Sequence, residues 1–271
     1  MACVLSSVDD ILALATASPE GVVRAAVFDA DGTLWRGDIG DAAFAGAVEA
    51  GLVLDATYHG PLRAWATRWD IVLDADKGRG LKRIMRAAEQ RELEATEGRR
   101  GWPSGTWRSE LYAMQAWIYA GHTSARVEAY GVALFDAGFA DGIFADMRRL
   151  LEGLAQLRVA VWIASASHTS LVVPGAARLG VARARVLGME PVVDDAGVIG
   201  AALRRSSYGP GKAAAVHDAL GGRPLLAFGD SVLGTDRELL ALAHAPVAVA
   251  SKGLHREAAL ADARMFAFDP K

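Results

Sequence analysis

Residues 22–37 of the chain read VVRAAVFDADGTLWRG, an apolar run that ends in two carboxylates two residues apart. The apolar part predicts a buried parallel strand. A protein core gains nothing from Asp29 and Asp31 at the end of such a strand, because a carboxylate must be solvated, paired or bound to a metal. A catalyst gains a nucleophile or metal ligand in one carboxylate and a general acid and base in the other. Gly32 lets the backbone turn closely around a ligand, and the hydroxyl of Thr33 can orient one.

A lone D-x-D-G-T sequence also has an ordinary explanation, namely a strand end, an Asx turn and the cap of a following helix. The rest of the chain decides between the two, and it alternates strands with helices. The hydrophobic pattern predicts helix 7–17, strand 22–30, helix 143–157, strand 159–164, a helix ending at Leu179, a hairpin over 185–203, helix 211–220, strand 224–228, helix 235–243, strand 246–250, helix 254–263 and strand 265–268. This spacing predicts an α/β fold with a doubly wound, mostly parallel, Rossmann-like sheet, which binds ligands at the carboxyl ends of its strands.

Residues 38–140 have a different character. They lack β-type runs, and helical periodicity dominates them. We therefore expect an α-helical cap domain at 38–140, inserted into a core made of residues 1–37 and 141–271.

The predicted cap is rich in tryptophan, with Trp65, Trp69, Trp102, Trp107 and Trp117. An aromatic box could bind a quaternary ammonium group by cation–π attraction. The helical spacing of the first two and of Trp107 favours the plainer interpretation, in which they pack the core of the cap itself. Trp102, in a predicted loop, is the better candidate for a lid residue.

The composition limits the kinds of partner. The net charge of −3 offers no basic surface for nucleic acid or for a membrane. No apolar run approaches the roughly 18 residues that a membrane span needs. The one cysteine, Cys3, excludes an internal disulfide, and the first residues lack the basic region of a secretory signal. We expect a cytoplasmic protein that acts on a small molecule; its oligomeric state is left open.

Three further polar residues stand where such a sheet would place a ligand. Ser165 follows the strand at 159–164, Asp230 follows the strand at 224–228, and Lys212 opens a helix after Gly-Pro-Gly. Each alone has an ordinary explanation as a helix cap, a turn or a solvated lysine. Their appearance in this order, each in its predicted context, favours a site.

That order resembles the four motifs of the haloacid dehalogenase superfamily: D-x-D-x-T, a Ser or Thr that ends a hydrophobic strand, a Lys, and an acidic G-D. The resemblance covers residues 22–38 and 141–271, and it implies an aspartate-nucleophile phosphohydrolase with a helical cap. Asp29 would be the nucleophile that forms an aspartyl-phosphate. Asp31 would be the general acid and base, and its presence distinguishes the phosphatases from the dehalogenases of this superfamily.

The resemblance also implies a phosphate site and a metal site. Ser165 and Lys212 would bind the phosphoryl group, together with the hydroxyl of Thr33. Asp29, Asp31 (through its backbone carbonyl) and Asp230 would hold Mg²⁺, which prefers carboxylate oxygens and water.

The last motif departs from the family pattern. The superfamily usually has another Asp three or four residues past the first, and this chain has Gly234 and Thr235 at those positions. Asp236 fills that role through a longer loop, or it caps helix 235–243; the sequence leaves both open.

The substrate is indicated only in outline. Trp35-Arg36-Gly37-Asp38 resembles the branch with phosphoserine and phosphorylcholine phosphatases, in which an acidic residue at the place of Asp38 meets the ammonium group of the substrate. The alternative is that Asp38 caps the helix beginning near Asp41. Phosphoserine, phosphorylcholine and phosphoethanolamine are the candidate esters, and transfer of phosphate to an alcohol or a catalytically silent Mg²⁺-binding or phosphate-binding module are the alternative functions.

Two more positions stay undecided at this stage. An arginine that would bind a substrate carboxylate could be Arg63, Arg68 or Arg83. His168 could line the entrance of the site, but its place after the predicted strand favours a solvated loop histidine.

Overall fold

The computed structural model describes residues 3–17, 19–96 and 105–271. Eight strands of these residues form one sheet in the order β1-β8-β7-β6-β2-β3-β4-β5. Every neighbouring pair is parallel except β4 with β5. The strands are β1 (Cys3–Val4), β2 (Val22–Phe28), β3 (Ala160–His168), β4 (Val186–Val193), β5 (Ile199–Arg205), β6 (Arg223–Gly229), β7 (Ala245–Val249) and β8 (Phe266–Phe268). The predicted mostly parallel α/β fold and the predicted hairpin are confirmed.

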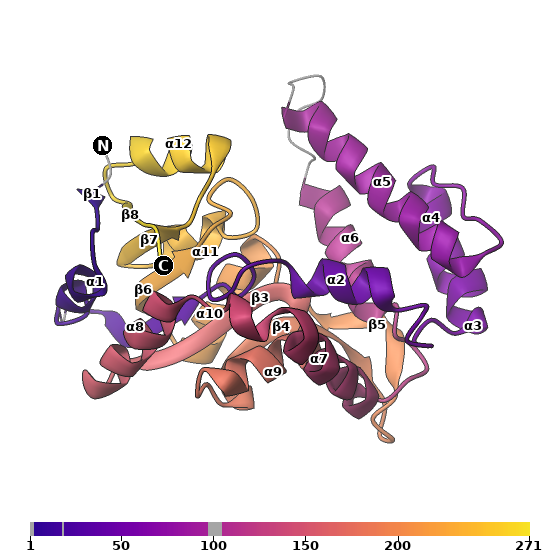
Figure 1. The fold of residues 1–271 in the computed structure, drawn as a ribbon, viewed down its shortest axis with the longest axis horizontal. Helices are drawn as coiled ribbons and strands as arrows, with labels where there is room; N and C mark the ends of the chain where they lie inside the picture. Colours follow the sequence, from indigo (N-terminus) through magenta and orange to yellow (C-terminus); the bar gives the residue numbers. More distant parts are fainter. Residues whose placement is uncertain (1–2, 18, 97–104) are drawn as a thin grey trace.

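Helices cover both faces of this sheet, as Figure 1 shows. Successive side chains of a strand point to opposite faces, and Phe28 and Val27 of β2 accordingly belong to two different buried clusters. On the Phe28 side lie α1 (Val8–Leu14), α8 (Ala145–Gln156) and α9 (Thr169–Arg178). On the Val27 side lie α10 (Pro210–Leu220), α11 (Arg237–Leu242) and α12 (Gly253–Ala261). The sheet is therefore doubly wound, and β2 lies near its middle.

Between β2 and β3 the chain is helical. The elements are α2 (Ile39–Gly46), α3 (Asp55–Thr57), a π-helical turn at Tyr58–Leu62, α4 (Arg63–Arg68), α5 (Lys77–Thr96), α6 (Gly105–Trp117), α7 (Ser124–Gly138) and a 3₁₀ turn at Ala140–Gly142; a further 3₁₀ turn lies at Arg183–Arg185. In Figure 1, α5 and α6 rise away from the sheet, while α7 packs against α9. One buried cluster runs through both the inserted helices and the sheet.

Three tryptophans of the inserted helices pack against one another. Trp65 stacks on Trp107 with ring centroids 5.6 Å apart, and Trp69 meets Trp107 edge-on at 4.8 Å. Trp65 and Trp107 are buried, and the guanidinium of Arg91 lies 4.1 Å above the ring of Trp107. These three tryptophans thus form a core rather than an open box. Trp102, the lid candidate, lies outside the described residues.

The end of β3 differs from the sequence prediction. The strand continues to His168, so Ser165 lies within it, and its register shifts between Ala164 and His168. The polar Ser-Ala-Ser-His segment suggests a solvated loop, but α9 and the inserted helices bury it. His168 is buried, and its Nδ1 accepts from the backbone N–H of Ser170 at the start of α9. The prediction of a solvated loop histidine was wrong.

No helix among the described residues is both long enough and apolar enough to span a membrane. The short strand β1, which pairs with β8, was not predicted because two residues carry no detectable pattern.

Candidate active site

The loop after β2 lies against the loop after β6 at the carboxyl ends of these neighbouring parallel strands. Asp29 donates its backbone N–H to the carbonyl of Phe228, and Gly32 has a φ of +75°. A Cβ at Gly32 would lie 2.5 Å from Oδ2 of Asp230, so this close approach requires glycine. The two acidic motifs, 201 residues apart in Asp29 and Asp230, are thereby brought to one place.

Lys212 lies beneath this loop, and it is fully buried. Its Nζ donates to Oδ1 of Asp29 at 2.7 Å and to Oδ1 of Asp236 at 2.6 Å. Burial alone would lower the pKa of Lys212, but the carboxylates of Asp236 and Asp29 outweigh it and raise the pKa above its usual value. The lysine therefore remains a cation, and it holds one oxygen of Asp29 in place.

Asp236 does not cap the helix that follows it. Its side chain makes no capping bond to α11. One carboxylate oxygen accepts from Lys212, and the other accepts from the backbone N–H of Ser231 at 3.0 Å. Of the two possibilities left open by the sequence, the structure places this carboxylate in the acidic cluster.

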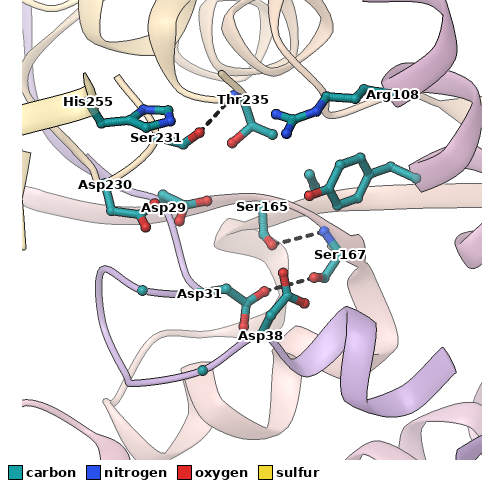
Figure 2. A pocket seen from close by; sticks show the side chains of 14 residues that line it. Asp29, Asp31, Asp38, Arg108, Ser165, Ser167, Asp230, Ser231, Thr235 and His255 are labelled. Carbon is teal, nitrogen blue, oxygen red and sulfur yellow. Dashed lines mark hydrogen bonds between the residues drawn. The ribbon is translucent and has the colours of Figure 1, made fainter. Parts of the chain in front are cut away.

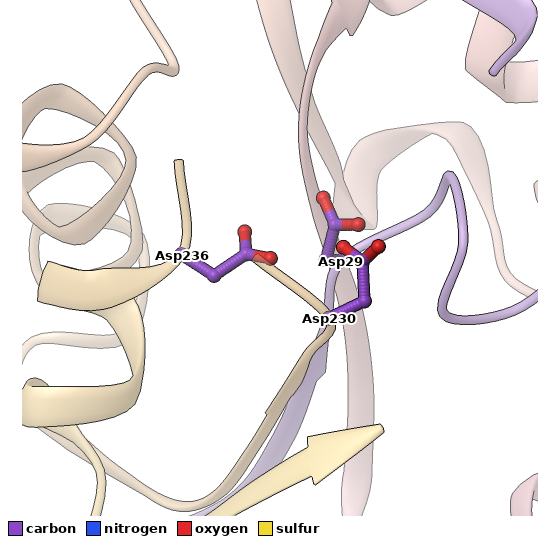
Figure 3. Close-up of side chains that lie close together, drawn as sticks. All are labelled: Asp29, Asp230 and Asp236. Atoms are coloured by element: carbon purple, nitrogen blue, oxygen red, sulfur yellow. The ribbon is translucent and has the colours of Figure 1, made fainter. Parts of the chain in front are cut away.

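Asp29, Asp230 and Asp236 form that cluster, with one ligand atom of each within 4.8 Å of the others. In Figure 3 the carboxylate of Asp236 points toward the other two. Burial and the negative charge of Asp236 raise the pKa of Asp230 to about 7, and burial with the same neighbour raises the pKa of Asp29 well above its usual range. Two buried carboxylates and the partly buried Asp230 face one lysine, so the site has a deficit of positive charge.

This donor set fits a divalent cation. Mg²⁺ takes carboxylate oxygens and water, and a cation here would offset the repulsion that raises the pKa values of Asp29 and Asp230. The sequence assigned the metal to Asp29, Asp31 and Asp230. Asp31 was assigned through its backbone carbonyl. Its carboxylate accepts from Ser167, and Asp236 joins Asp29 and Asp230 in the cluster.

Asp31 accepts hydrogen bonds on both of its carboxylate oxygens. Trp35 Nε1 and the backbone N–H of Ile39 donate to Oδ1, at 2.8 and 2.9 Å, and the hydroxyl of Ser167 donates to Oδ2 at 2.8 Å. Burial raises the pKa of Asp31 above its usual value, and these bonds offset the effect in part. The two aspartates of the first motif therefore lie in different environments, as an acid and a nucleophile require.

Ser165 is buried, and it lines the same cavity as Asp29 and Asp31. Its Oγ accepts from the backbone N–H of Ser167 at 3.0 Å. Thr33 is also buried, but it is not among the cavity-lining residues, and no partner of its Oγ1 is found in the described part of the chain. The structure thus brings Ser165 to the site and leaves Thr33 beneath it.

A cavity of about 430 Å³ opens over these side chains. Figure 2 draws the side chains that line it and labels ten of them. The lining residues are Asp29, Asp31, Gly32, Gly37, Asp38, Arg108, Tyr112, Ser165, Ala166, Ser167, Asp230, Ser231, Thr235 and His255. The sequence did not identify Arg108, Tyr112, Ser167, Ser231, Thr235 or His255 as site residues.

Asp38 caps a helix, as one of the two interpretations of the sequence expected, and it also lines the cavity. Its Oδ1 accepts from the backbone N–H of Asp41 at 2.8 Å at the start of α2. Burial, with the charges of Asp31 and Asp41, raises the pKa of Asp38 well above its usual range. A positively charged group in the cavity would reverse that effect.

The three arginines considered for a substrate carboxylate lie elsewhere. Arg63 contacts His59, Arg68 pairs with Glu110 and Arg83 pairs with Asp74, and none of the three lines the cavity. Arg108 of α6 does line it, together with Tyr112 four residues later on the same helix. The sequence does carry one signal for these two residues. Their spacing of four places them on the same face of α6, beside its apolar stripe.

The sequence matches the model of the family described as haloacid dehalogenase-like hydrolase over residues 26–241. No curated protein matches the chain significantly.

Solved structures share the fold at low sequence identity. A protein of unknown function from Bordetella pertussis Tohama I is 18% identical with a TM-score of 0.62, and the match covers 90% of this chain and 98% of that one. A phosphoserine phosphohydrolase-like protein from Francisella tularensis subsp. tularensis SCHU S4 is 15% identical with a TM-score of 0.50, covering 89% and 94%. A substrate-bound phosphoserine phosphatase is 14% identical with a TM-score of 0.50, covering 92% and 94%.

Proposed function

The chain belongs to the family of haloacid dehalogenase-like hydrolases, and we propose that it is a Mg²⁺-dependent phosphatase that acts on small phosphomonoesters. One observation carries the proposal. Asp29 has one oxygen held by Lys212, and its carboxylate faces a cavity that Ser165 and Asp31 also line. Asp31, the second carboxylate of the first motif, favours a phosphatase site over a dehalogenase site.

In the proposed reaction, an oxygen of Asp29 attacks phosphorus and the bond from phosphorus to the ester oxygen breaks. Asp31 gives its proton to that leaving oxygen, which departs as an alcohol. Asp31 then takes a proton from a water molecule that attacks the aspartyl-phosphate, and the Asp29 carboxylate and inorganic phosphate are released. Lys212 offsets the negative charge of Asp29 throughout, and Ser165 donates to a phosphoryl oxygen.

The magnesium ion would be held by Asp29, Asp230 and Asp236, with the backbone carbonyl of Asp31 as the further ligand that the family resemblance implies. When bound, it supplies positive charge that neutralises the phosphoryl group. The protein residues provide the positioning, since phosphoryl transfer depends mainly on alignment and charge stabilisation.

We propose an amine-bearing substrate, such as phosphoserine, phosphoethanolamine or phosphorylcholine. Asp38 supports this, because its carboxylate lines the cavity and burial makes its negative charge costly without a positive partner. The proposed partner is therefore a small phosphorylated metabolite, and neither nucleic acid nor a membrane is part of the proposal. A cytoplasmic location, and a division into a core of residues 1–37 and 141–271 with a cap at 38–140, belong to the same proposal.

The test is phosphate release by the purified full chain from a panel of esters: phosphoserine, phosphoethanolamine, phosphorylcholine, sugar phosphates and para-nitrophenyl phosphate. We expect turnover with Mg²⁺, none with EDTA, and none in Asp29→Asn. Added glycerol shows whether phosphate is also transferred to an alcohol. Absence of turnover on every ester, with Mg²⁺ still bound, would replace the proposal with a silent binding module.

A further inference from the structure

The carboxylate of Asp31 is held by three hydrogen bonds that divide unequally between its oxygens. Two N–H groups, from the indole of Trp35 and the backbone of Ile39, donate to Oδ1. One hydroxyl, from Ser167, donates to Oδ2, as the dashed line in Figure 2 marks. The donors come from the loop after β2, from α2 and from β3, so three parts of the chain fix one carboxylate.

This division determines which oxygen can exchange a proton. A carboxylate oxygen has two lone-pair sites. On Oδ1 both sites face N–H groups, which cannot accept a proton. On Oδ2 one site accepts from the hydroxyl of Ser167, and the other has no donor among the described residues. Oδ2 is therefore the oxygen that is available for proton transfer.

We infer that Asp31 exchanges its proton through Oδ2, and that Ser167 and Trp35 are positioning residues that direct this oxygen toward the ester. The inference rests on the proposed function, since it concerns the acid and base of the same site. Ser167 belongs to none of the four sequence motifs, and it lies two positions after Ser165 on β3.

Close packing holds both donors in place. A Cβ at Gly40 would lie 2.6 Å from Oγ of Ser167, so the approach of α2 to β3 depends on a glycine there. A Cβ at Gly175 would lie 2.8 Å from the indole of Trp35, which is fully buried. The side chains have little freedom to turn away from Asp31.

Ser167 also connects the acid–base residue with the phosphate site. Its backbone N–H donates to Oγ of Ser165, and its own hydroxyl donates to Asp31. One residue thus orients both the side chain that faces the phosphoryl group and the side chain that serves the leaving oxygen. In the step itself, the electron pair of the breaking phosphorus–oxygen bond stays on the ester oxygen, which takes the proton from Oδ2. Oδ2 recovers a proton from the attacking water.

The experiment uses the dependence of rate on the leaving group. An alkyl alcohol must be protonated as it departs, whereas para-nitrophenol leaves readily as an anion. The quantity compared is kcat/KM, which reports all steps up to and including the first irreversible one. It is measured for an alkyl ester that the enzyme accepts and for para-nitrophenyl phosphate. Because general acid catalysis contributes about 10²–10⁴-fold, we expect Ser167→Ala and Trp35→Phe to lower kcat/KM about tenfold for the alkyl ester and about twofold or less for the nitrophenyl ester.

Two matched controls separate positioning from a general structural effect. Ser207→Ala removes another buried hydroxyl, which donates to the carbonyl of Leu187. Trp65→Phe removes an indole N–H for which no partner is found within the described chain. Both should leave the ratio of the two kcat/KM values unchanged.

The outcomes distinguish this inference from the proposed function. Equal losses on both esters in Ser167→Ala would overturn the positioning role, while activity of the unmodified enzyme would keep the phosphatase proposal intact. An unmodified enzyme without activity on either ester would overturn the phosphatase proposal itself. If Trp35→Phe does not fold, as judged by its circular dichroism, Ser167→Ala decides alone.

Discussion

Lys212 and Asp236 form a fully buried ion pair, with Nζ 2.6 Å from Oδ1. The same ammonium group contacts Asp29 at 2.7 Å. Asp236 therefore fixes the lysine that fixes the proposed nucleophile, and it also lies within the acidic cluster. The sequence could equally explain Asp236 as a helix cap, but in the structure it holds Lys212 in place.

The first prediction concerns Asp236→Asn. The amide keeps the size of the side chain but removes one of the three negative charges. Loss of a supporting group in a metal site typically lowers metal affinity or activity about 10- to 100-fold. We expect a loss in this range in kcat/KM and a higher Mg²⁺ concentration for half-maximal activity, both measured in a magnesium titration.

Asp218→Asn is the matched control, because Asp218 is an exposed aspartate on the surface of α10. It should leave both quantities unchanged. If Asp236→Asn behaves like this control, Asp236 has no part in the site.

The second prediction concerns removal of the metal. Three clustered carboxylates have one lysine beside them, so we expect the protein to unfold at a lower temperature in EDTA than in Mg²⁺. An ion present at 100 times its dissociation constant stabilises the folded state by about 2.7 kcal/mol. Asp230→Asn removes one of the repelling charges, so in EDTA it should be at least as stable as the unmodified protein. The unfolding temperature of Asp230→Asn should rise little when Mg²⁺ replaces EDTA, and thermal unfolding measures this.

Asp195→Asn, at an exposed turn of the hairpin, serves as control and should gain as much from Mg²⁺ as the unmodified protein. A large gain from Mg²⁺ in Asp230→Asn would mean that the ion binds elsewhere.

The sequence predicts those parts of the site that follow directly from a strand. Asp29 and Asp230 stand at the ends of two apolar runs, and the parallel sheet necessarily brings such ends together. Lys212 is predicted by its place after Gly-Pro-Gly at a helix start. In each case a pattern within about ten residues fixes both the element and the position of the side chain.

The missed residues depend on contacts between distant segments. Ser167 is significant only because α2 approaches β3 at Gly40, and Arg108 only because α6 lies over the cavity. His168 belongs to a polar run whose burial comes entirely from packing. No local pattern records which helix will cover a strand end, so these residues appear only in the folded chain.

The third prediction concerns Asp38→Asn. Asparagine caps a helix as well as aspartate does, so α2 should be unaffected. Removal of the charge should lower kcat/KM for an ammonium-bearing substrate about tenfold, because a hydrogen bond to a charged group contributes about 1.5–3 kcal/mol. The nitrophenyl ester lacks the amine and should be spared.

The control is Asp218→Asn, at an exposed position on α10 that does not line the cavity. Comparable losses of phosphoserine and para-nitrophenyl phosphate turnover in Asp38→Asn would count against recognition of an amine. Equal effects of the two variants would do the same.

The fourth prediction concerns the stability of the fold in acid. Burial lowers the pKa of His168 to about 4, whereas an unfolded histidine titrates near 6.5. Between these values the unfolded chain binds the proton and the folded chain does not, so folding is opposed as the pH falls. The contribution is fully present above pH 6.5 and is lost between about 6.5 and 4, up to about 3 kcal/mol.

His168→Asn isolates this effect, because an asparagine oxygen can still accept from the N–H of Ser170 at the start of α9 but does not titrate. Urea unfolding at pH 7 and pH 5 gives the free energy of unfolding of both proteins. Other groups titrate alike in the two, so their contributions cancel in the difference. The unmodified protein should lose about 2 kcal/mol more than the variant on going to pH 5, since one pKa unit corresponds to about 1.4 kcal/mol. An equal loss in both proteins would mean that His168 accepts a proton without cost, and hence that the end of β3 opens to water.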